Sequence, residues 1–187
     1  MSEQAAGRAA PAEDQSAAPT HGAARAERFV QLWRELDAPG LIKAMAAGEV
    51  PSAPHFDHMG LEVVDAEHGE VRLRWTPGEA LLNPAGLVHG GYLSVVLDDA
   101  TGLAAASAAE RFLPMLTMDL RVDFVRPALA GVTHEVTGRL VHPGRTRRIA
   151  DGQVHAPDGR LIARASGSFT PNKAFDPDAD RRTRADG

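Results

Sequence analysis

The stretch that decides the fold runs from residue 83 to residue 109 and reads NPAGLVHGGYLSVVLDDATGLAAASAA. It opens with a turn that contains Pro and Gly, passes through a His-Gly-Gly triplet, and continues as a long apolar run. Small or apolar residues recur on every side of this run, so we predict a helix over 91–109 that is buried all round. Two aspartates near its middle, Asp98 and Asp99, then lie inside the protein.

A carboxylate inside an apolar helix is costly, because burying an unpaired charge opposes folding by several kcal/mol. A chain that keeps such a group commonly uses it, so we expect an enzyme site. Asp98 and Asp99 point about 100° apart around the helix, and we expect only one of them to face the site. We predict Asp98, which shares a polar stripe with Ser94 and Thr101. Asp99 is then expected to pair with a cation or to accept a hydrogen bond from a buried N–H.

Alternating apolar and polar residues on both sides of this helix predict strands. The clearest alternation covers residues 116–124, which we expect to bury one face. Further strands are predicted near 59–65, 71–75, 132–140, 145–155 and 160–170. Hairpin-length turns join most of them, which favours antiparallel pairing. The predicted fold class is therefore α+β, with six antiparallel strands wrapped around one long central helix.

The two ends of the chain have a different composition. Residues 1–23 are rich in Ala, Gly and Pro without a periodic apolar pattern, and we expect them to be disordered. Residues 24–54 are interpreted as a helical extension, with helices over 24–37 and 41–47. We expect the first helix to pack on the outer face of the sheet or at a subunit boundary. The main domain spans 55–171, and a charged, solvated tail covers 172–187.

Composition narrows the function further. The chain has 187 residues, a formal net charge of −5 and no cysteine. The lack of cysteine excludes disulfides, thiolate metal sites and a cysteine nucleophile. The acidic balance disfavours nucleic acid as a partner, and aspartates within the longest apolar run disfavour a membrane span. No apolar signal region begins the chain, so a cytoplasmic protein is expected.

The Asn-x-x-Gly-x-x-His-Gly-Gly pattern over 83–91, followed by Asp98 eight residues after Gly90, resembles the hotdog-fold acyl-CoA thioesterases. The resemblance is to the phenylacetate-pathway (PaaI-like) branch of the 4-hydroxybenzoyl-CoA thioesterase superfamily and covers about residues 55–170. It implies hydrolysis of an acyl-CoA thioester without a cofactor, since CoA is part of the substrate. It also implies a homodimer or homotetramer whose active sites lie between subunits.

The resemblance assigns roles to five residues. Asp98 takes the position of the catalytic carboxylate. Asn83, His89 and Gly90 match the loop that receives the thioester carbonyl. Thr117 falls where relatives have a Ser or Thr that positions water. The loop and the carboxylate are expected to come from opposite subunits.

The same site follows from physical chemistry. Gly90 and Gly91 open a helix, where free N–H groups can stabilise a developing oxyanion. Asp98 lies ~11 Å further along that helix, too far to act on the same carbonyl, which independently favours a site shared by two subunits. Burial should raise the pKa of Asp98 and make it a better base. Activation of water and direct attack by Asp98 both stay open at this point.

Other residues have two interpretations each. Gly91 lets a substrate approach the backbone closely, or simply forms a turn. Four arginines have guanidinium groups suited to the phosphates of CoA, or are solvated strand ends: Arg126, Arg145, Arg147 and Arg148. His89 has either a chemical role or a structural hydrogen bond, and Thr117 is either a site residue or an ordinary strand residue. A metal site at His89 and an aspartate is disfavoured, because no third ligand has suitable spacing.

Two further functions compete with thioester hydrolysis. The fold also serves non-catalytic roles, so an acyl-CoA-binding or regulatory module is the alternative. A hotdog enoyl-CoA hydratase is disfavoured, because His89 precedes Asp98 by nine residues instead of lying close to it. Gly102, Ala105 and Ala106 leave room for a chain or ring. Aryl-acetyl, benzoyl and medium aliphatic acyl groups all stay open.

Overall fold

A computed structural model describes residues 21–175, with side chains from residue 27 onward. Three helices come first: α1 (His21–Glu35), α2 (Ala38–Ala46) and α3 (Pro54–Met59). The predicted disorder of residues 1–23 lies outside the described residues, except that residues 21–23 begin α1. The predicted tail likewise lies outside them from residue 176 onward.

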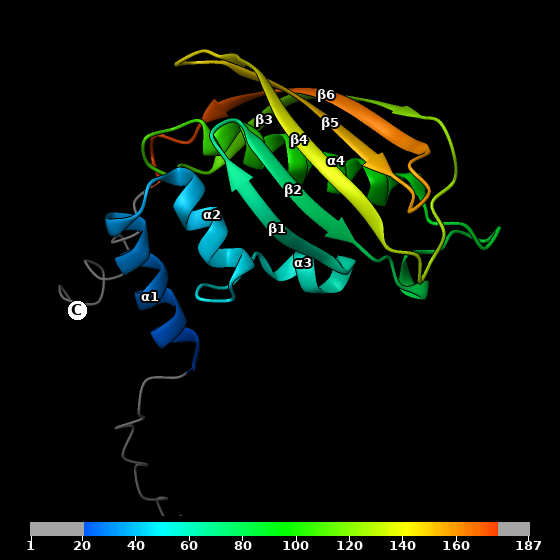
Figure 1. Cartoon of the computed structure of the whole chain (residues 1–187), viewed down its shortest axis with the longest axis horizontal. Helices are drawn as coiled ribbons and strands as arrows, with labels where there is room; N and C mark the ends of the chain where they lie inside the picture. Colours follow the sequence, from blue (N-terminus) through cyan, green and yellow to red (C-terminus); the bar gives the residue numbers. More distant parts are fainter. Residues whose placement is uncertain (1–20, 176–187) are drawn as a thin grey trace, which may run out of the picture.

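Six strands form one antiparallel sheet in the order β1-β2-β4-β5-β6-β3. The strands are β1 (Leu61–Glu67), β2 (Glu70–Trp75), β3 (Met115–Phe124), β4 (His134–Pro143), β5 (Arg148–His155) and β6 (Leu161–Pro171). After β2 and the short 3-10 helix η1 (Glu79–Leu81), the long helix α4 (Gly90–Ser107) leads to β3 at the far edge. The sheet curves over α4 (Figure 1), which confirms the predicted α+β architecture.

The helix α4 lies close against the middle of the sheet because glycines face it there. A Cβ atom at Gly138 of β4 would collide with the carbonyl oxygen of Ala100, and one at Gly152 of β5 would lie 2.9 Å from Thr101 Cγ2. The helix buries most of its apolar residues, among them Leu93, Val96, Leu97, Ala100 and Ala104. Removal of this apolar surface from water provides the main stabilisation of the domain. Val95 is 39% exposed, so the expectation of a helix buried all round is wrong for the single chain.

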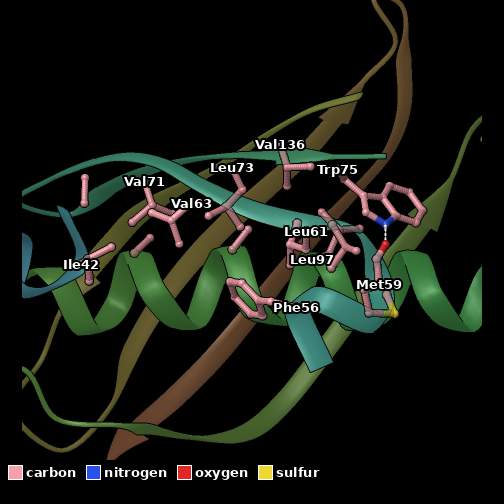
Figure 2. Packing of buried hydrophobic residues seen from close by; sticks show 14 of the residues in the cluster. Ile42, Phe56, Met59, Leu61, Val63, Val71, Leu73, Trp75, Leu97 and Val136 are labelled. Carbon is pink, nitrogen blue, oxygen red and sulfur yellow. Dashed lines mark hydrogen bonds between the residues drawn. The ribbon is translucent and has the colours of Figure 1, made fainter. Parts of the chain in front are cut away.

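The core continues from α4 to the N-terminal helices. In Figure 2, Trp75 of β2 donates its indole N–H to the carbonyl oxygen of Met59 at 2.9 Å, which attaches the end of α3 to the sheet. Asp37 caps α2 by accepting a hydrogen bond from the Gly40 N–H at 2.8 Å. The buried face of α2 packs against β1 and α4. The helices α2 and α3 therefore lie on the α4 side of the sheet. The first helix, α1, packs against α2 and not on the outer face of the sheet, and its expected place at a subunit boundary stays a prediction.

The helix α3 was not predicted, and the sequence indicated only a strand near 59–65 in this region. Pro54 begins this helix at a position that suits proline. Gly60 ends it with a left-handed φ of 67°. The predicted strand from residue 59 therefore begins at Leu61.

The clearest strand prediction, that residues 116–124 bury one face, is wrong for strand β3. It lies at the edge of the sheet and pairs only with β6, so Leu116, Met118 and Phe124 are 51%, 59% and 56% exposed in the single chain. The strand also contains a β-bulge between Thr117 and Asp119. The regular alternation expected over 116–124 is therefore broken, and the strand does not bury one continuous face.

Candidate active site

The loop before α4 is held by Asn83. Its side-chain oxygen accepts hydrogen bonds from the N–H groups of Ala85 at 2.9 Å and Leu87 at 3.2 Å. The backbone N–H of Asn83 donates to the Leu87 carbonyl at 2.7 Å. Asn83 therefore shapes the turn that delivers the chain to the start of α4, as Asx turns do. Its expected contact with a thioester carbonyl stays a prediction.

His89 caps the N-terminus of α4. Its Nδ1 atom accepts a hydrogen bond from the Gly91 N–H at 3.0 Å, so the proton of the neutral ring lies on Nε2. The Gly91 N–H is therefore not free, contrary to our expectation for both glycines. The N–H of Gly90, the first residue of the helix, has no hydrogen-bond partner among residues 21–175. Gly90 is thus the one of the two glycines whose N–H is available to an oxyanion.

Asp98 lies in the middle of α4 and meets Thr117 of β3. The Thr117 hydroxyl donates to the two carboxylate oxygens of Asp98, at 2.9 Å and 3.2 Å. Burial raises the pKa of Asp98, and the hydrogen bond from Thr117 partly opposes this. The predicted direction of the shift is confirmed, and two residues 19 positions apart in the sequence meet.

The bulge in β3 explains how Thr117 reaches Asp98. Thr117 pairs with Phe169 of β6, and Leu120 pairs with Gly167. Paired residues point to the same face of a sheet, so Thr117 and Leu120 share the face toward α4 although they are three positions apart. Without the extra residue they would point to opposite faces. The bulge therefore turns Thr117 from the expected polar face toward the carboxylate.

Asp99 has a partner of its own, His55 at the start of α3. The His55 Nε2 atom lies 3.1 Å and 3.0 Å from the two carboxylate oxygens of Asp99. Burial raises the pKa of Asp99 to about 6, while the nearby His55 opposes the shift and Asp98 adds to it. The Asp99 side chain is 19% exposed. The partner that we expected for Asp99 is thus an imidazole.

Both carboxylates face one cavity of about 270 Å³. The expectation that only one aspartate would face the site is wrong, because the cavity is wide enough to span two helix positions. The polar side chains in its lining are Asp98, Asp99 and Thr117. The remaining lining residues are Met45, Ala53, Phe56, Gly102, Leu103, Ala106, Phe112, Pro114, Met115 and Phe169. A site of this kind suits an apolar group placed beside a carboxylate with a raised pKa.

The arginines are not gathered at this cavity. Arg145 and Arg147 precede β5 in a turn instead of sharing a strand face, because β5 begins at Arg148. Arg147 pairs with Asp119 at 3.0 Å, and Arg126 donates to the Leu161 carbonyl at 2.8 Å. Arg148 donates to the Ala105 carbonyl near the end of α4 at 2.5 Å. None of the four lines the cavity, and their contact with CoA phosphates stays a prediction.

Within residues 21–175, no three His, Asp or Glu side chains are placed so that they could share a metal ion. His89, which we considered for such a group, caps the end of α4, about two turns from Asp98. The same part of the chain contains no helix that is both long and apolar enough to cross a membrane.

His55 is the site residue that sequence reasoning missed. Pro54, which suits the first position of a helix, was the one signal that a short helix begins there. The pairing with Asp99 joins residues 44 positions apart. No sequence pattern of helix or strand period connects them.

Comparison with known proteins identifies the family to which this chain is similar. The model of the thioesterase superfamily matches residues 85–163. A putative esterase of Pseudomonas aeruginosa is 39% identical over 87 residues, which are 46% of this chain and 64% of that protein, slightly less than two thirds of its length. A putative esterase of Halobacterium salinarum is 36% identical over 104 residues, which are 53% of this chain and 68% of that protein.

Solved structures share the fold. A putative thioesterase of Ralstonia eutropha JMP134, described as related to phenylacetic acid degradation, superposes with a TM-score of 0.63 at 29% identity, covering 69% of this chain and 98% of that one. A Streptococcus mutans UA159 protein bound to acetyl CoA gives a TM-score of 0.56 at 26% identity, covering 60% and 88%. With its sheet of six strands around one helix, the chain belongs to the thioesterase superfamily and has the hotdog fold of the PaaI-like enzymes.

Proposed function

We propose that the protein hydrolyses an acyl-CoA thioester to the free acid and CoA, with Asp98 as the catalytic carboxylate. The observation that carries this proposal is a carboxylate with a raised pKa that accepts hydrogen bonds from Thr117 and lines a mainly apolar cavity. Membership of the thioesterase superfamily supports the reaction type. The acetyl CoA in the similar S. mutans structure supports CoA as the carrier.

The reaction requires one proton acceptor and one oxyanion donor. Ionised Asp98 takes a proton from water as the water oxygen bonds to the thioester carbon. The tetrahedral intermediate then breaks its C–S bond, and Asp98 returns the proton to the departing CoA sulfur. In the alternative route the Asp98 oxygen itself attacks and water later hydrolyses the anhydride. A single turnover in ¹⁸O-labelled water tests direct attack: if water hydrolyses the anhydride at the Asp98 carbonyl, the acid leaves with two unlabelled oxygens and the label stays on Asp98.

The oxyanion donor in this proposal is the Gly90 N–H. It is unpaired among residues 21–175, and it lies ~11 Å along α4 from Asp98 of the same chain. We therefore propose that a second copy supplies Gly90 to each site. Strand β3 supports this assembly, because it is an edge strand with large exposed apolar side chains such as Leu116 and Phe124.

The first test measures thiol release from a panel of acyl-CoAs by the wild type, Asp98→Asn and Asp99→Asn. We expect turnover by the wild type, its near-complete loss in Asp98→Asn, and its retention in Asp99→Asn. The Asp99 variant is a matched control on the same helix and the same cavity. Undiminished turnover by Asp98→Asn would refute the assigned role. Binding of acyl-CoA with no turnover by the wild type would instead favour the non-catalytic binding module.

The second test concerns the shared site. Gly90→Pro removes the N–H at the first helical position, where proline is well tolerated, and His89 has the extended backbone that suits a residue before proline. We expect about a 10²–10³-fold loss of activity, as for other oxyanion donors. Gly90→Ala is the control, because it keeps the N–H and places a Cβ at the same 3.4 Å from the Phe124 ring.

Mixing Asp98→Asn with Gly90→Pro then distinguishes a site shared by two subunits from a site within one subunit. In a mixed dimer of Asp98→Asn and Gly90→Pro, one site combines an unchanged Asp98 with an unchanged Gly90 if these residues come from opposite subunits. We expect activity to return after subunit exchange. No recovery, although exchange is verified by a tag on one variant, would indicate a site within a single subunit.

A further inference from the structure

One wall of the cavity comes from the three helices before β1 (α1 to α3, residues 21–59), which we now call the N-terminal extension because α3 continues the segment predicted over 24–54. It lies outside the segment that the family model matches. Met45 at the end of α2, Ala53, and Phe56 of α3 line the cavity opposite Gly102 and the neighbouring residues of α4. The matched segment begins only at residue 85. The helix α4 lies within the matched segment, whereas this wall, like strands β1 and β2, precedes it.

The wall is fixed to the domain at both ends of α3. At its start, His55 bonds both carboxylate oxygens of Asp99. At its end, the Met59 carbonyl accepts the Trp75 indole N–H, and Phe56 between them is buried. Figure 2 shows the Phe56 ring extending from α3 toward α4. A helix of six residues has little intrinsic stability, so these contacts determine where Phe56 lies.

The extension also holds the opposite end of the cavity. The Trp33 indole N–H of α1 donates to the carbonyl of Phe112 at 2.6 Å. Arg111 donates to the Arg34 carbonyl at 2.6 Å. Phe112 and Pro114, in the loop between α4 and β3, both line the cavity. The helices α2 and α3 therefore supply one wall of the cavity, and α1 holds the loop that supplies another.

The size and the lining of this partly open cavity favour certain acyl groups. Its volume of about 270 Å³ lies near the lower end of the range for ligand pockets, roughly 300–1,000 Å³. Its lining holds no cation, while Asp98 and Asp99 are both carboxylates. A negatively charged acyl group would be repelled, and a long chain would meet the ring of Phe56 or Phe112.

We propose that the N-terminal extension selects the substrate: α3 closes the cavity around a compact, uncharged, apolar acyl group, and His55 positions this wall through Asp99. This inference rests on the proposed function, because it assigns the acyl class of the same site. Phe56 is the specificity-determining residue, and His55 is a positioning residue.

The test measures binding of two non-hydrolysable thioethers, S-hexyl-CoA and S-hexadecyl-CoA, together with hydrolysis of hexanoyl-, palmitoyl- and succinyl-CoA. We expect the wild type to prefer the hexyl over the hexadecyl ligand, and hexanoyl-CoA over the other two substrates, by about tenfold or more. Preference for the long or the charged acyl group would overturn the proposal.

Phe56→Ala should open the wall and reduce the hexyl-over-hexadecyl preference about tenfold. Met59→Ala is the matched control, because Met59 is equally buried in the same helix but does not line the cavity. It should destabilise the protein without changing the preference. The same change of preference in both variants would indicate general loosening of α3 and would refute a specific wall.

His55→Ala should raise KM for hexanoyl-CoA several-fold with little change in kcat, since His55 acts on the wall and does not touch the reacting atoms. His55→Gln, which keeps a donor toward Asp99, should restore part of the affinity. His58→Ala, one turn further along the exposed side of α3, should behave as the wild type. A fall in kcat with unchanged KM in His55→Ala would contradict a positioning role.

The two proposals fail in different ways. Hydrolysis of hexanoyl-CoA with no change of preference in Phe56→Ala would refute the wall and leave the thioesterase function intact. Binding of S-hexyl-CoA with the expected change in Phe56→Ala, but no hydrolysis, would refute the function and leave the wall intact. Failure of the wild type to bind either thioether would refute both.

Discussion

The two sides of the cavity use neighbouring aspartates in different ways. Asp98 meets a hydroxyl of the sheet, Thr117, whereas Asp99 meets an imidazole of the N-terminal extension, His55. Both carboxyls belong to one helix, and burial raises the pKa of both. The same desolvation therefore acts on two groups whose partners differ.

The partner decides what each carboxyl is suited to do. The Thr117 hydroxyl leaves Asp98 able to accept a proton. It also holds the Asp98 side chain beside the apolar space where an acyl group would lie. An imidazole engages both oxygens of Asp99, which attaches another segment of chain to the helix. The comparison teaches that two partly buried aspartates on one helix can have different partners, which we propose divides them into a catalytic group and a structural group.

The largest expected effect is on kcat, which should distinguish the role of Asp98 from that of Asp99. We expect Asp98→Asn to reduce kcat for acyl-CoA hydrolysis by about 10²–10⁴-fold, the usual contribution of a positioned acid or base. Asp99→Asn should reduce kcat by less than about tenfold, because an amide can still accept a hydrogen bond from His55. Steady-state kinetics at saturating substrate measures both. Equal losses in the two variants would mean that the carboxyls act as one catalytic unit.

The second expected effect is on how the free energy of unfolding depends on pH through Asp99. The folded pKa of Asp99 is about 6, against an ordinary value of 3.8. Folding therefore favours the neutral carboxyl of Asp99. This stabilisation is fully present below about pH 4 and is lost as the pH rises through 6. It changes the free energy of unfolding by on the order of 3 kcal/mol. Asp99→Asn should lose less stability than the wild type between pH 4 and pH 7. Urea denaturation at several pH values measures this, and parallel pH curves for the two proteins would contradict the assignment.

The third effect concerns the hydroxyl partner. Thr117→Val removes the hydrogen bond that lowers the pKa of Asp98, so that pKa should rise further. The acid limb of the pH profile of kcat/KM should move to higher pH, and the rate at pH 6 should fall about tenfold. Thr170→Val, on the neighbouring strand outside the cavity, is the control. An unmoved acid limb would exclude Asp98 as the titrating base.

The smallest effect lies at the start of the same helix. His89→Ala removes the side chain that caps α4, and we expect a loss of about 1 kcal/mol in the free energy of unfolding. His89 of the same chain lies about two turns from Asp98, so the acid limb of the pH profile should stay where it is unless the His89 of a second copy reaches the base. Denaturant unfolding and the pH profile together test this. A shift of the acid limb would show that His89 influences the base directly.

Much of the architecture was predictable from local pattern. The apolar run over 91–109 predicted the central helix, and the alternating segments predicted six strands, because periodicities of 3.6 and 2 reflect which side of an element is buried. The direction of the Asp98 pKa shift followed from the same burial. These features depend on residues close together in the chain.

The errors have physical causes that lie outside local pattern. The bulge in β3 inserts one residue without a sequence signal, so the face of Thr117 could not be read from alternation. The edge position of β3 left exposed the apolar side chains that we expected to be buried. The Gly91 N–H, which we expected to be free, donates a hydrogen bond to the His89 side chain that caps α4.

By itself, the sequence determined the hotdog architecture and a central helix that contains two aspartates, since these follow from burial periodicity and from the motif over 83–98. Only the tertiary structure decided that Thr117 faces Asp98, that His55 bonds Asp99, and that the extension supplies one wall of the cavity. These contacts join segments 19 to 44 residues apart. Their geometry depends on strand register and helix placement, which arise only when the whole chain packs.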